Sequence, residues 1–365
     1  MGNMLNEIGG GNTPEEPVDI TTITDTNHDK IKGKDIYGNI VTIPKGFKVV
    51  TSEGTTVPEG IVIEDINRNQ FVWIPVGTVY KDETGTNTST IKLGRYTFGT
   101  NGTPTMQQSA FAGDNPSNAS QTYADEFPIM GFNDNHIEVD ESRPGTVDDS
   151  NHKNDLNATA KNLAGFVGSV KDNGGYYLAR YEASYGSGYD SSGSTDAEKY
   201  VNAKPLSQVS KANSEDSMNY QAGTLWNFVN ELDASKICQN MYKDDETVEV
   251  ESDLTNSYAW DTAIVFIQEM EKNNYAYANC DTAGNTTLKN TGETGDKACN
   301  IYDMAGNLVE WTTEYSTGTD SSSADPCTIR GGFYDYSDFY TASRDSGTAT
   351  DSDIIVGFRP ALYIK

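Results

Sequence analysis

The chain has 365 residues, which allows one to three domains of ordinary size and a sizeable hydrophobic core. Its 54 acidic residues outnumber 26 basic ones, and the net charge of −28 argues against nucleic acid as a partner because phosphates would be repelled. No apolar run approaches the ~18 residues of a membrane-spanning helix, so we expect no direct membrane insertion.

The first 40 residues are polar and carry few apolar side chains, a composition typical of linkers. We therefore expect a flexible N-terminal arm over residues 1–40 and one folded domain over residues 41–365. The start, Met1-Gly2-Asn3-Met4, has no signal-peptide pattern. We expect either that the protein is used without export or that an export and anchor segment lies outside this sequence.

Three short runs in the next part of the chain are typical of β-strands. They cover residues 43–50, 60–63 and 70–76, and turn residues separate them. Residues 81–157 are rich in Thr, Gly, Asn and Asp, and only 91–98 predicts a strand there. Long loops of this kind are either functional or mobile, so we expect a loop-rich insertion.

Helical patterns dominate the middle of the chain. Residues 158–170 predict a helix that ends at Asn173-Gly174-Gly175. Residues 176–183 alternate as a strand, and residues 220–241 and 258–270 carry apolar side chains at helical spacing, which predicts the two main helices. Four tryptophans lie in predicted scaffold elements, and we expect them in the core: Trp73, Trp226, Trp260 and Trp311.

The last third of the chain contains three anchors in order. The first is Asp303-Met-Ala-Gly-Asn-x-x-Glu-Trp311, in which Ala-Gly-Asn signals a turn before a short strand. The second is Arg330-Gly-Gly, whose glycines permit close backbone approach, and the third is Gly357-Phe-Arg before a terminal strand. Residues 333–356, between the second and third anchors, are here called the display segment.

These anchors resemble the formylglycine-generating-enzyme branch of the C-type lectin fold. They resemble its bacterial surface and phage relatives more closely, including the variable proteins of diversity-generating retroelements, whose hypervariable segment lies between Arg-Gly-Gly and Gly-Phe-Arg. Residues 43–47, 70–76 and 180–183 also resemble elements of that family, so the resemblance covers about residues 40–365. It implies an α+β fold with small, twisted, mostly antiparallel sheets, two main helices and long loops.

The residues needed for this family's enzymatic chemistry are missing. Its oxidases use a cysteine pair after Arg-Gly-Gly to bind copper, whereas the display segment has no cysteine and Cys327 stands alone before it. Related iron enzymes need three histidines, but His28, His136 and His152 stand in polar loops without a second ligand at metal spacing. We therefore predict no catalytic residues, no cofactor and no enzyme activity. The alternative is a catalytic member that uses an unrecognised cofactor.

Two further motifs have a functional and a structural interpretation. Residues 25–29 alternate like a calcium loop, but Lys30 replaces the required Gly and Ile36 the bidentate Glu, which favours a solvated turn. Arg180-Tyr181-Glu182 could form an acid site, although an ion pair on a strand is the favoured interpretation. The resemblance also implies that structural calcium, where it binds, sits at loop carbonyls near residues 300–307.

Four cysteines allow three pairings and suit an oxidising compartment: Cys238, Cys280, Cys299 and Cys327. Cys280 and Cys299 bracket a loop rich in Gly, Thr and Asn, which makes them the best candidates for a disulfide. The alternative, four unpaired or buried thiols, is favoured by their small number in so long a chain.

Composition sets the display segment apart. Residues 315–364 contain no Lys, Glu, Gln, Met or Trp, although these types are common elsewhere in the chain. The retroelement relatives mutate adenines in Asn-type codons, which can give Tyr, Phe, Asp, Ser and Thr but none of those five types. An ordinary acidic, Ser/Thr/Gly-rich surface is the alternative. Either way, Tyr and Phe supply rigid contact area and the short polar residues adaptable hydrogen bonds.

We therefore predict a non-enzymatic binding protein of the retroelement-variable, adhesin or phage-receptor-binding type. It would act on a cell surface, outside the cell or on a virion tail, against an unknown protein or glycan on another cell surface. The predicted ligand-binding residues face solvent: Tyr334, Asp335, Tyr336, Asp338, Phe339, Tyr340, Asp345, Ser346, Thr348, Thr350, Asp351 and Asp353. The residues predicted to hold the backbone are Arg330, Gly331, Gly332, Ala342, Ser343, Arg344, Gly357, Phe358 and Arg359.

Overall fold

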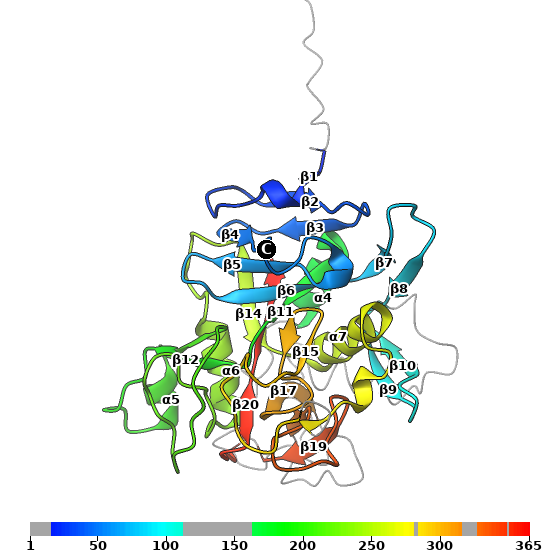
Figure 1. Ribbon diagram of the computed structural model, residues 1–365. Helices are drawn as coiled ribbons and strands as arrows, with labels where there is room; N and C mark the ends of the chain where they lie inside the picture. The colour runs from blue at the N-terminus through cyan, green and yellow to red at the C-terminus, as the bar shows by residue number, and fades with distance from the viewer. Residues whose placement is uncertain (1–15, 112–162, 281–283, 316–326, 349) are drawn as a thin grey trace, which may run out of the picture.

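The centre of the fold is a six-stranded antiparallel sheet that joins distant parts of the chain (Figure 1). The computed structural model describes residues 16–111, 163–280, 284–315, 327–348 and 350–365. In sheet order the strands are β14 (Val250–Leu254), β21 (Pro360–Ile364), β11 (Gly175–Ala179), β6 (Gln70–Pro75), β5 (Val62–Asp65) and β4 (Phe47–Val49). The last strand of the chain, β21, is therefore an inner strand held by β14 and β11.

The inner strands are apolar on both faces because the sheet is covered on both sides. Every residue of β11 and β21 is buried, and so are five of the six in β6. The helices that pack on this sheet are α4 (Leu163–Asn173) on β11 and β21, α6 (Glu231–Asn240) on β14, and α7 (Ser257–Met270) on β6. All four tryptophans are fully buried, as predicted.

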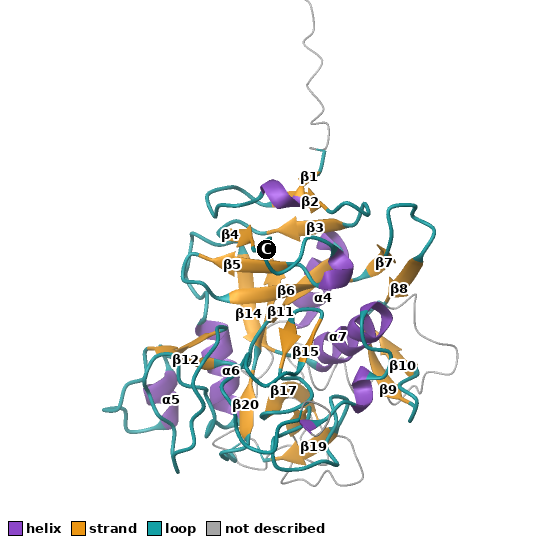
Figure 2. Ribbon diagram, viewed as in Figure 1, coloured by secondary structure: helices purple, strands orange, loops and turns teal. Residues whose placement is uncertain are grey.

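Smaller sheets surround the central one (Figure 2). At one end, β1 (Val18–Asp19), β2 (Ile31–Lys34) and β3 (Ile40–Ile43) form a three-stranded sheet. At the other end lies a four-stranded sheet in the order β19 (Arg344–Gly347), β18 (Cys327–Arg330), β17 (Val309–Tyr315) and β20 (Val356–Phe358). The remaining strands pair as β7 (Gly77–Tyr80) with β8 (Thr88–Ile91), β9 (Gly94–Phe98) with β10 (Pro104–Ser109), β12 (Ser184–Ser187) with β13 (Lys204–Leu206), and β15 (Lys297–Ala298) with β16 (Ile301–Tyr302).

Short helical pieces complete the architecture. They are α5 (Asp196–Tyr200) and the 3₁₀ turns η1 (Ile20–Thr22), η2 (Val57–Glu59) and η4 (Tyr275–Tyr277). Within the part of the chain that the structure describes, no helix is long and apolar enough to cross a membrane. The mixture of small sheets and few helices confirms the predicted α+β class.

The prediction of a flexible arm is wrong for residues 18–40. Ile20 and Ile23 are buried in the core, and the Val49 backbone N–H donates to the Ile23 carbonyl at 2.9 Å. The segment has few apolar residues, but its two buried isoleucines suffice to anchor a small sheet whose polar residues face solvent. The apolar content averaged over 40 residues could not predict this, because only two side chains of the segment enter the core. Residues 1–15 lie outside the described residues.

The prediction of one strand in residues 81–157 is also incomplete. The β7–β8 and β9–β10 hairpins occupy residues 77–109. Threonine is a good strand residue because its branched side chain fits a pleated surface, so the Thr-rich composition is compatible with strands as well as loops. The part of this prediction that concerns residues 112–157 lies outside the described residues.

Helix boundaries differ from the expectation at one main helix. The pattern over 220–241 predicts a helix, yet α6 begins only at Glu231, because the Asn230 side chain caps it by accepting from the Asp233 N–H at 2.8 Å. Before the cap, Phe228 adopts a left-handed φ of 54°, which a helix cannot accommodate. The prediction for 258–270 is confirmed by α7, and α4 covers the described part of 158–170.

The candidate disulfide between Cys280 and Cys299 is not formed. All four cysteines are buried, and none of them forms a disulfide in the part of the chain that the structure describes. The thiol of Cys280 donates to the Tyr336 carbonyl at 3.5 Å, whereas that of Cys299 donates to the Pro58 carbonyl at 3.7 Å. The two side chains thus contact different parts of the fold. Their positions on either side of a Gly/Thr/Asn-rich loop could not indicate this.

Candidate ligand-binding surface

The display segment lies at the end of the molecule away from the N-terminal sheet (Figure 1). It leaves β18, forms a turn, returns as β19 along β18, and ends in β20. Strand β20 pairs in parallel with β17, so both anchors that flank the segment belong to one four-stranded sheet. The scaffold therefore fixes the segment at both ends.

The glycine pair at the start of the segment is required by close backbone contact. Gly331 has a φ of 88°, a conformation that favours glycine. A Cβ atom at Gly332 would lie 2.4 Å from the Ala305 carbonyl oxygen, and one at Gly331 would lie 2.9 Å from that of Met304. The chain thus leaves β18 in direct contact with the first anchor, and the predicted structural role of both glycines agrees with this geometry.

The turn of the display segment is held through its backbone. The Thr341 and Ala342 N–H groups donate to the Ala278 and Ala276 carbonyls at 2.9 and 3.0 Å. The indole Nε1 of Trp260 donates to the Thr341 carbonyl at 2.9 Å. These bonds use main-chain atoms of the segment, so they do not depend on the side chains that it carries.

The far end of the segment is held in the same way. The Phe228 N–H donates to the Asp353 carbonyl at 3.0 Å, and the Val309 N–H donates to the Ile355 carbonyl at 3.0 Å. The Asn227 amide donates to the Ile354 carbonyl at 2.9 Å. The unusual conformation of Phe228 thus directs a backbone donor at the segment.

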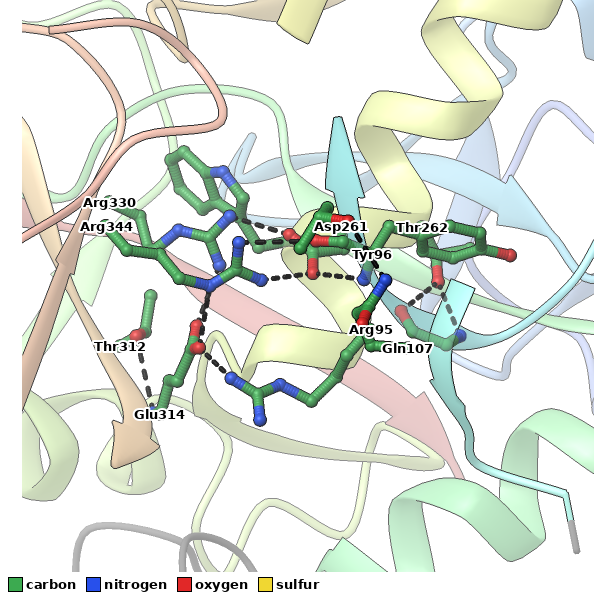
Figure 3. Close-up of polar contacts among 12 residues, drawn as sticks. Arg95, Tyr96, Gln107, Asp261, Thr262, Thr312, Glu314, Arg330 and Arg344 are labelled. Atoms are coloured by element: carbon green, nitrogen blue, oxygen red, sulfur yellow. Dashed lines mark hydrogen bonds and ion pairs between the residues drawn. The ribbon is translucent and has the colours of Figure 1, made fainter. Parts of the chain in front are cut away.

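A buried ionic cluster lies beneath the segment (Figure 3). Arg330 pairs with Asp261 at 2.6 Å and with Glu314 at 2.8 Å. Arg344, in the segment itself, pairs with the same two carboxylates, and Arg95 of β9 pairs with Glu314. The cluster therefore joins β9, α7, β17, β18 and β19. Its two carboxylates compensate the positive charge of Arg344.

Charge compensation sets the ionisation of this cluster. Burial alone would raise the pKa of Glu314, but the three guanidinium groups around it lower that pKa below its ordinary value. A second ion pair holds the third anchor: Arg359 Nε donates to both oxygens of Glu310, at 2.9 and 2.7 Å, and Arg359 Nη2 donates to Oε1 at 2.5 Å. Arg359 is fully buried, in agreement with the predicted structural role of Gly-Phe-Arg.

Arg180 and Glu182 do not pair with each other. Arg180 pairs with Glu53 at 2.6 Å, so an ion pair does form, although not within the strand motif. Glu182 is buried and accepts from the Asn307 amide at 2.6 Å and the Leu308 N–H at 2.9 Å. Burial raises its pKa well above the ordinary value. Its hydrogen bonds fix the Ala-Gly-Asn turn of the first anchor.

The side chains of the display segment divide by exposure. Seven predicted ligand-binding residues are exposed: Asp335, Tyr336, Asp338, Asp345, Thr350, Asp351 and Asp353. Four are half-buried: Tyr334, Phe339, Tyr340 and Thr348. The side chain of Ser346 lies outside the described ones. None of the eleven described side chains is buried, so all of them have a solvent-facing part.

Aromatic rings form a small cluster on this surface. Phe333 stacks on Tyr336 with ring centroids 5.9 Å apart, and Phe339 contacts both rings edge-on at 5.4 and 5.6 Å. Tyr336 is 48% exposed, which makes it an accessible large side chain near the start of the segment. We call Phe333, Tyr336 and Phe339 the aromatic cluster.

Tyr277 and Asn279 are among the residues outside the segment that contact it and were not predicted. The ring of Tyr277 packs against Tyr340 at 5.2 Å, and the Asn279 amide donates to the Ser337 carbonyl at 2.6 Å. Their distance in sequence gave no signal of this contact. Phe333 was also missed, although its place directly after Arg-Gly-Gly could have indicated it.

Candidate metal ligands do not gather at one point among the described residues. Within the described ranges, no three His, Cys, Asp or Glu side chains are arranged to hold a metal ion. His28 contacts two backbone carbonyl oxygens, while His136 and His152 lie outside the described residues. Calcium at the carbonyls near residues 300–307 stays a prediction.

Comparison with known proteins agrees with this geometry at the level of fold. Residues 247–364, which include all three anchors, match the family model of the sulfatase-modifying factor enzyme 1-like domain. The match confirms the resemblance drawn from the anchors. Residues 247–364 of this α+β protein are thus similar to that domain.

Three solved structures are similar to this chain at low sequence identity. Treponema denticola variable protein 1 is 15% identical, over 81% of this chain and 96% of that chain, with a TM-score of 0.29. CarF is 16% identical over 52% of this chain and 87% of that chain (TM-score 0.35), and PvdO from Pseudomonas aeruginosa is 14% identical over 53% and 82% (TM-score 0.34). No curated protein matches the chain. These scores are too low to transfer residue roles.

Proposed function

We propose that this protein is a non-enzymatic binding protein that presents the display segment to a ligand. The observation that carries the proposal is a division between backbone and side chains. Backbone atoms of the segment bond to the scaffold at Asn307, Ala276 and Ala278, while none of its eleven described predicted side chains is buried. Such an arrangement lets side chains vary at small cost to the fold, since exposed substitutions usually change stability by about 0.5 kcal/mol or less.

The finer parts of the proposal concern origin and place. The missing Lys, Glu, Gln, Met and Trp of residues 315–364 support diversification by a retroelement. The ligand is a protein or a glycan on another cell surface, and the protein acts on a cell surface, as an adhesin, or on a virion tail. A template repeat and a reverse-transcriptase gene in the neighbouring DNA would support this origin, and their absence would contradict it.

A display library tests the function directly. The exposed positions Asp335, Tyr336, Asp338, Thr350, Asp351 and Asp353 are randomised on yeast-displayed protein. We expect most members to survive heating as the parent does, and selection against unrelated target proteins to yield binders. A control library randomises six positions that hold the backbone: Gly331, Gly332, Thr341, Ala342, Gly357 and Phe358. Equal loss of folded members in both libraries would contradict the proposal.

The alternative is a catalytic role with a cofactor, which the enzyme family of residues 247–364 makes worth testing. Metal analysis of the purified protein separates the two functions. Stoichiometric copper or iron would favour the enzyme, and its absence together with tolerant display positions would favour binding.

A further inference from the structure

We propose that the display segment binds a cationic polypeptide, a partner segment rich in Arg or Lys. The inference rests on the proposed binding function and names the chemistry of its partner. It follows from three features of the described surface: the charge of the segment, the aromatic cluster and the position of the charges around that cluster.

The segment carries more negative than positive charge. Its ionisable carboxylates are five aspartates, and Arg344 is its single basic residue. Arg344 is partly exposed, but it is already paired with the buried carboxylates of Asp261 and Glu314. Asp335, Asp338, Asp351 and Asp353 are exposed, and no Lys or Arg of the described chain forms an ion pair with them. Their charge is therefore available to a partner.

The aromatic cluster supplies the second part of the surface. The faces of aromatic rings carry partial negative charge and attract guanidinium and ammonium groups. The Tyr336 ring is half exposed, while Phe333 stacks on it and Phe339 contacts it edge-on. The apolar stems of Arg and Lys can pack on such rings while their charged ends reach carboxylates.

Carboxylates from both ends of the segment act on Tyr334, whose ring contacts the aromatic cluster through Phe333. Phe333 and Tyr334 are neighbours in the chain and their rings are in edge-on contact at 6.5 Å. Burial is the main reason that the pKa of Tyr334 is raised, and the charges of Asp335 and Asp353 raise it further. The charges of Asp335 and Asp353 thus both act on the Tyr334 hydroxyl, although these aspartates are 18 positions apart in sequence.

The same features disfavour other partners. Acidic glycans and nucleic acids would be repelled by the aspartates. A single metal ion needs several ligands around one point, and no group of three such side chains exists among the described residues. A neutral sugar could stack on Tyr336 but would leave the aspartates unused. A flexible chain with several separate positive charges fits this spacing best.

The test uses the full-length protein and a fluorescent peptide of about twelve residues with alternating Arg and Gly. Binding is followed by fluorescence anisotropy at roughly 0.15 M salt, where distant surface charges are screened. We expect the triple variant D335N/D338N/D353N to weaken binding at least about tenfold, since three exposed ion pairs are lost. Asparagine keeps the oxygen with which Asp353 accepts from the Ile355 N–H.

A matched variant controls for the large net charge of the protein. D29N/E83Q/E246Q removes three exposed negative charges far from the segment in sequence. We expect it to weaken binding less than about twofold. Equal weakening by the two triple variants would overturn the proposal, because the peptide would then follow overall charge alone. Circular dichroism of each variant confirms that it is folded.

A second pair of variants tests the ring. Tyr336→Ala should weaken peptide binding about threefold or more, while Tyr336→Phe, which keeps the ring face, should restore it. Tyr336→Ala that binds as tightly as the parent would overturn the role of the aromatic cluster. Displacement of the peptide by calcium or by a neutral glucose oligomer would assign the surface to those ligands instead.

The outcome is separable from the test of the proposed function. If most members of the display library stay folded and some bind targets, the binding function is supported. This holds even when the two triple variants bind the Arg-Gly peptide equally. In that case the function stands and the cationic partner is rejected. Loss of fold in the library rejects the function itself.

Discussion

The buried carboxyl group of Glu231 makes the stability of the fold depend on pH. Glu231 opens α6 and accepts from the Ser235 hydroxyl at 3.3 Å, and the Cys327 thiol lies 3.8 Å from its other oxygen. Burial raises its pKa from the ordinary 4.5 to about 8. The folded protein therefore holds this proton up to about pH 8, whereas the unfolded chain releases it near pH 4.5.

This difference predicts a loss of stability as pH rises. The unfolded state binds fewer protons than the folded state between those two pH values, so the free energy of unfolding falls, by up to about 1 kcal/mol per pH unit. We expect Glu231→Gln to remove this component, measured by urea unfolding at pH 5, 6, 7 and 8. Asp303, with a pKa raised to about 6, acts in the same direction in both proteins. Parallel pH profiles for parent and variant would contradict the assignment.

Two hairpin turns share one arrangement of side chains. In β5–β6, Asp65 accepts from the backbone N–H groups of Asn67 and Asn69 at 2.8 Å, and the Asn69 amide donates back to it. In β2–β3, Asp35 and Asn39 repeat the same bonds with the same spacing. Each Asp-Ile-x-x-Asn turn is thus closed by its own first and last residues.

Replacement of Asp65 tests how much these bonds stabilise the fold. Asp65 is buried and also accepts from the Tyr242 hydroxyl at 2.8 Å. Asp65→Ala leaves several buried donors without an acceptor, and we expect a loss of about 2 kcal/mol or more in urea unfolding. The exposed Asp25 makes a similar bond to Asn27, so Asp25→Ala is the matched control and should cost about 0.5 kcal/mol or less. Equal effects would show that burial does not decide the cost.

At the scale of elements, the strands and helices that can be predicted are those specified by their own residues. The strands β6 and β11 and the helix α7 are predicted because their own apolar patterns specify them. The start of α6 is not, because one asparagine cap outweighs an apolar spacing that continues before it. Strands β1 and β2 were missed because their stability comes from two isoleucines inserted into a distant core.

The candidate surface shows the same limit. The glycine anchors and the exposure of Asp335 and Tyr336 follow from motif and composition, which act over a few residues. The contact of Tyr277 with Tyr340 could not be predicted, since packing alone joins these segments. The ionic cluster around Glu314 is also invisible in sequence, because its five members come from five different elements.

The anchor glycines and the displayed side chains should respond oppositely to substitution. Gly332→Ala places a Cβ 2.4 Å from the Ala305 carbonyl oxygen, so backbone must move, and we expect a loss of about 2 kcal/mol or more. Tyr336→Ser and Asp338→Ser alter exposed side chains and should each cost about 0.5 kcal/mol or less. Thermal melting of the three variants compares them. A Tyr336 variant that unfolds the domain would contradict the display role.

At the scale of the whole molecule, strand order couples the two ends of the chain. The C-terminal strand β21 lies between β14 and β11, and β11 continues through β6 and β5 to β4. The N-terminal sheet joins the same core through Ile20 and Ile23, and Lys30 donates to the carbonyl of Lys365 at 3.0 Å. Because the central sheet contains strands from both halves of the chain, division of the chain between them would leave that sheet incomplete in each half.

This topology predicts one cooperative unit from about Val18 to Lys365. Urea unfolding followed by tryptophan fluorescence and by far-ultraviolet circular dichroism should give coincident transitions, since the four buried tryptophans report the same core as the backbone. After mild proteolysis, fragments should stay associated under native conditions, and the N-terminal sequence of the protected core should begin before Val18. A stable fragment that ends near residue 200 and folds alone would show two units, because β14 and β21 would then be dispensable for the sheet that contains β6 and β11.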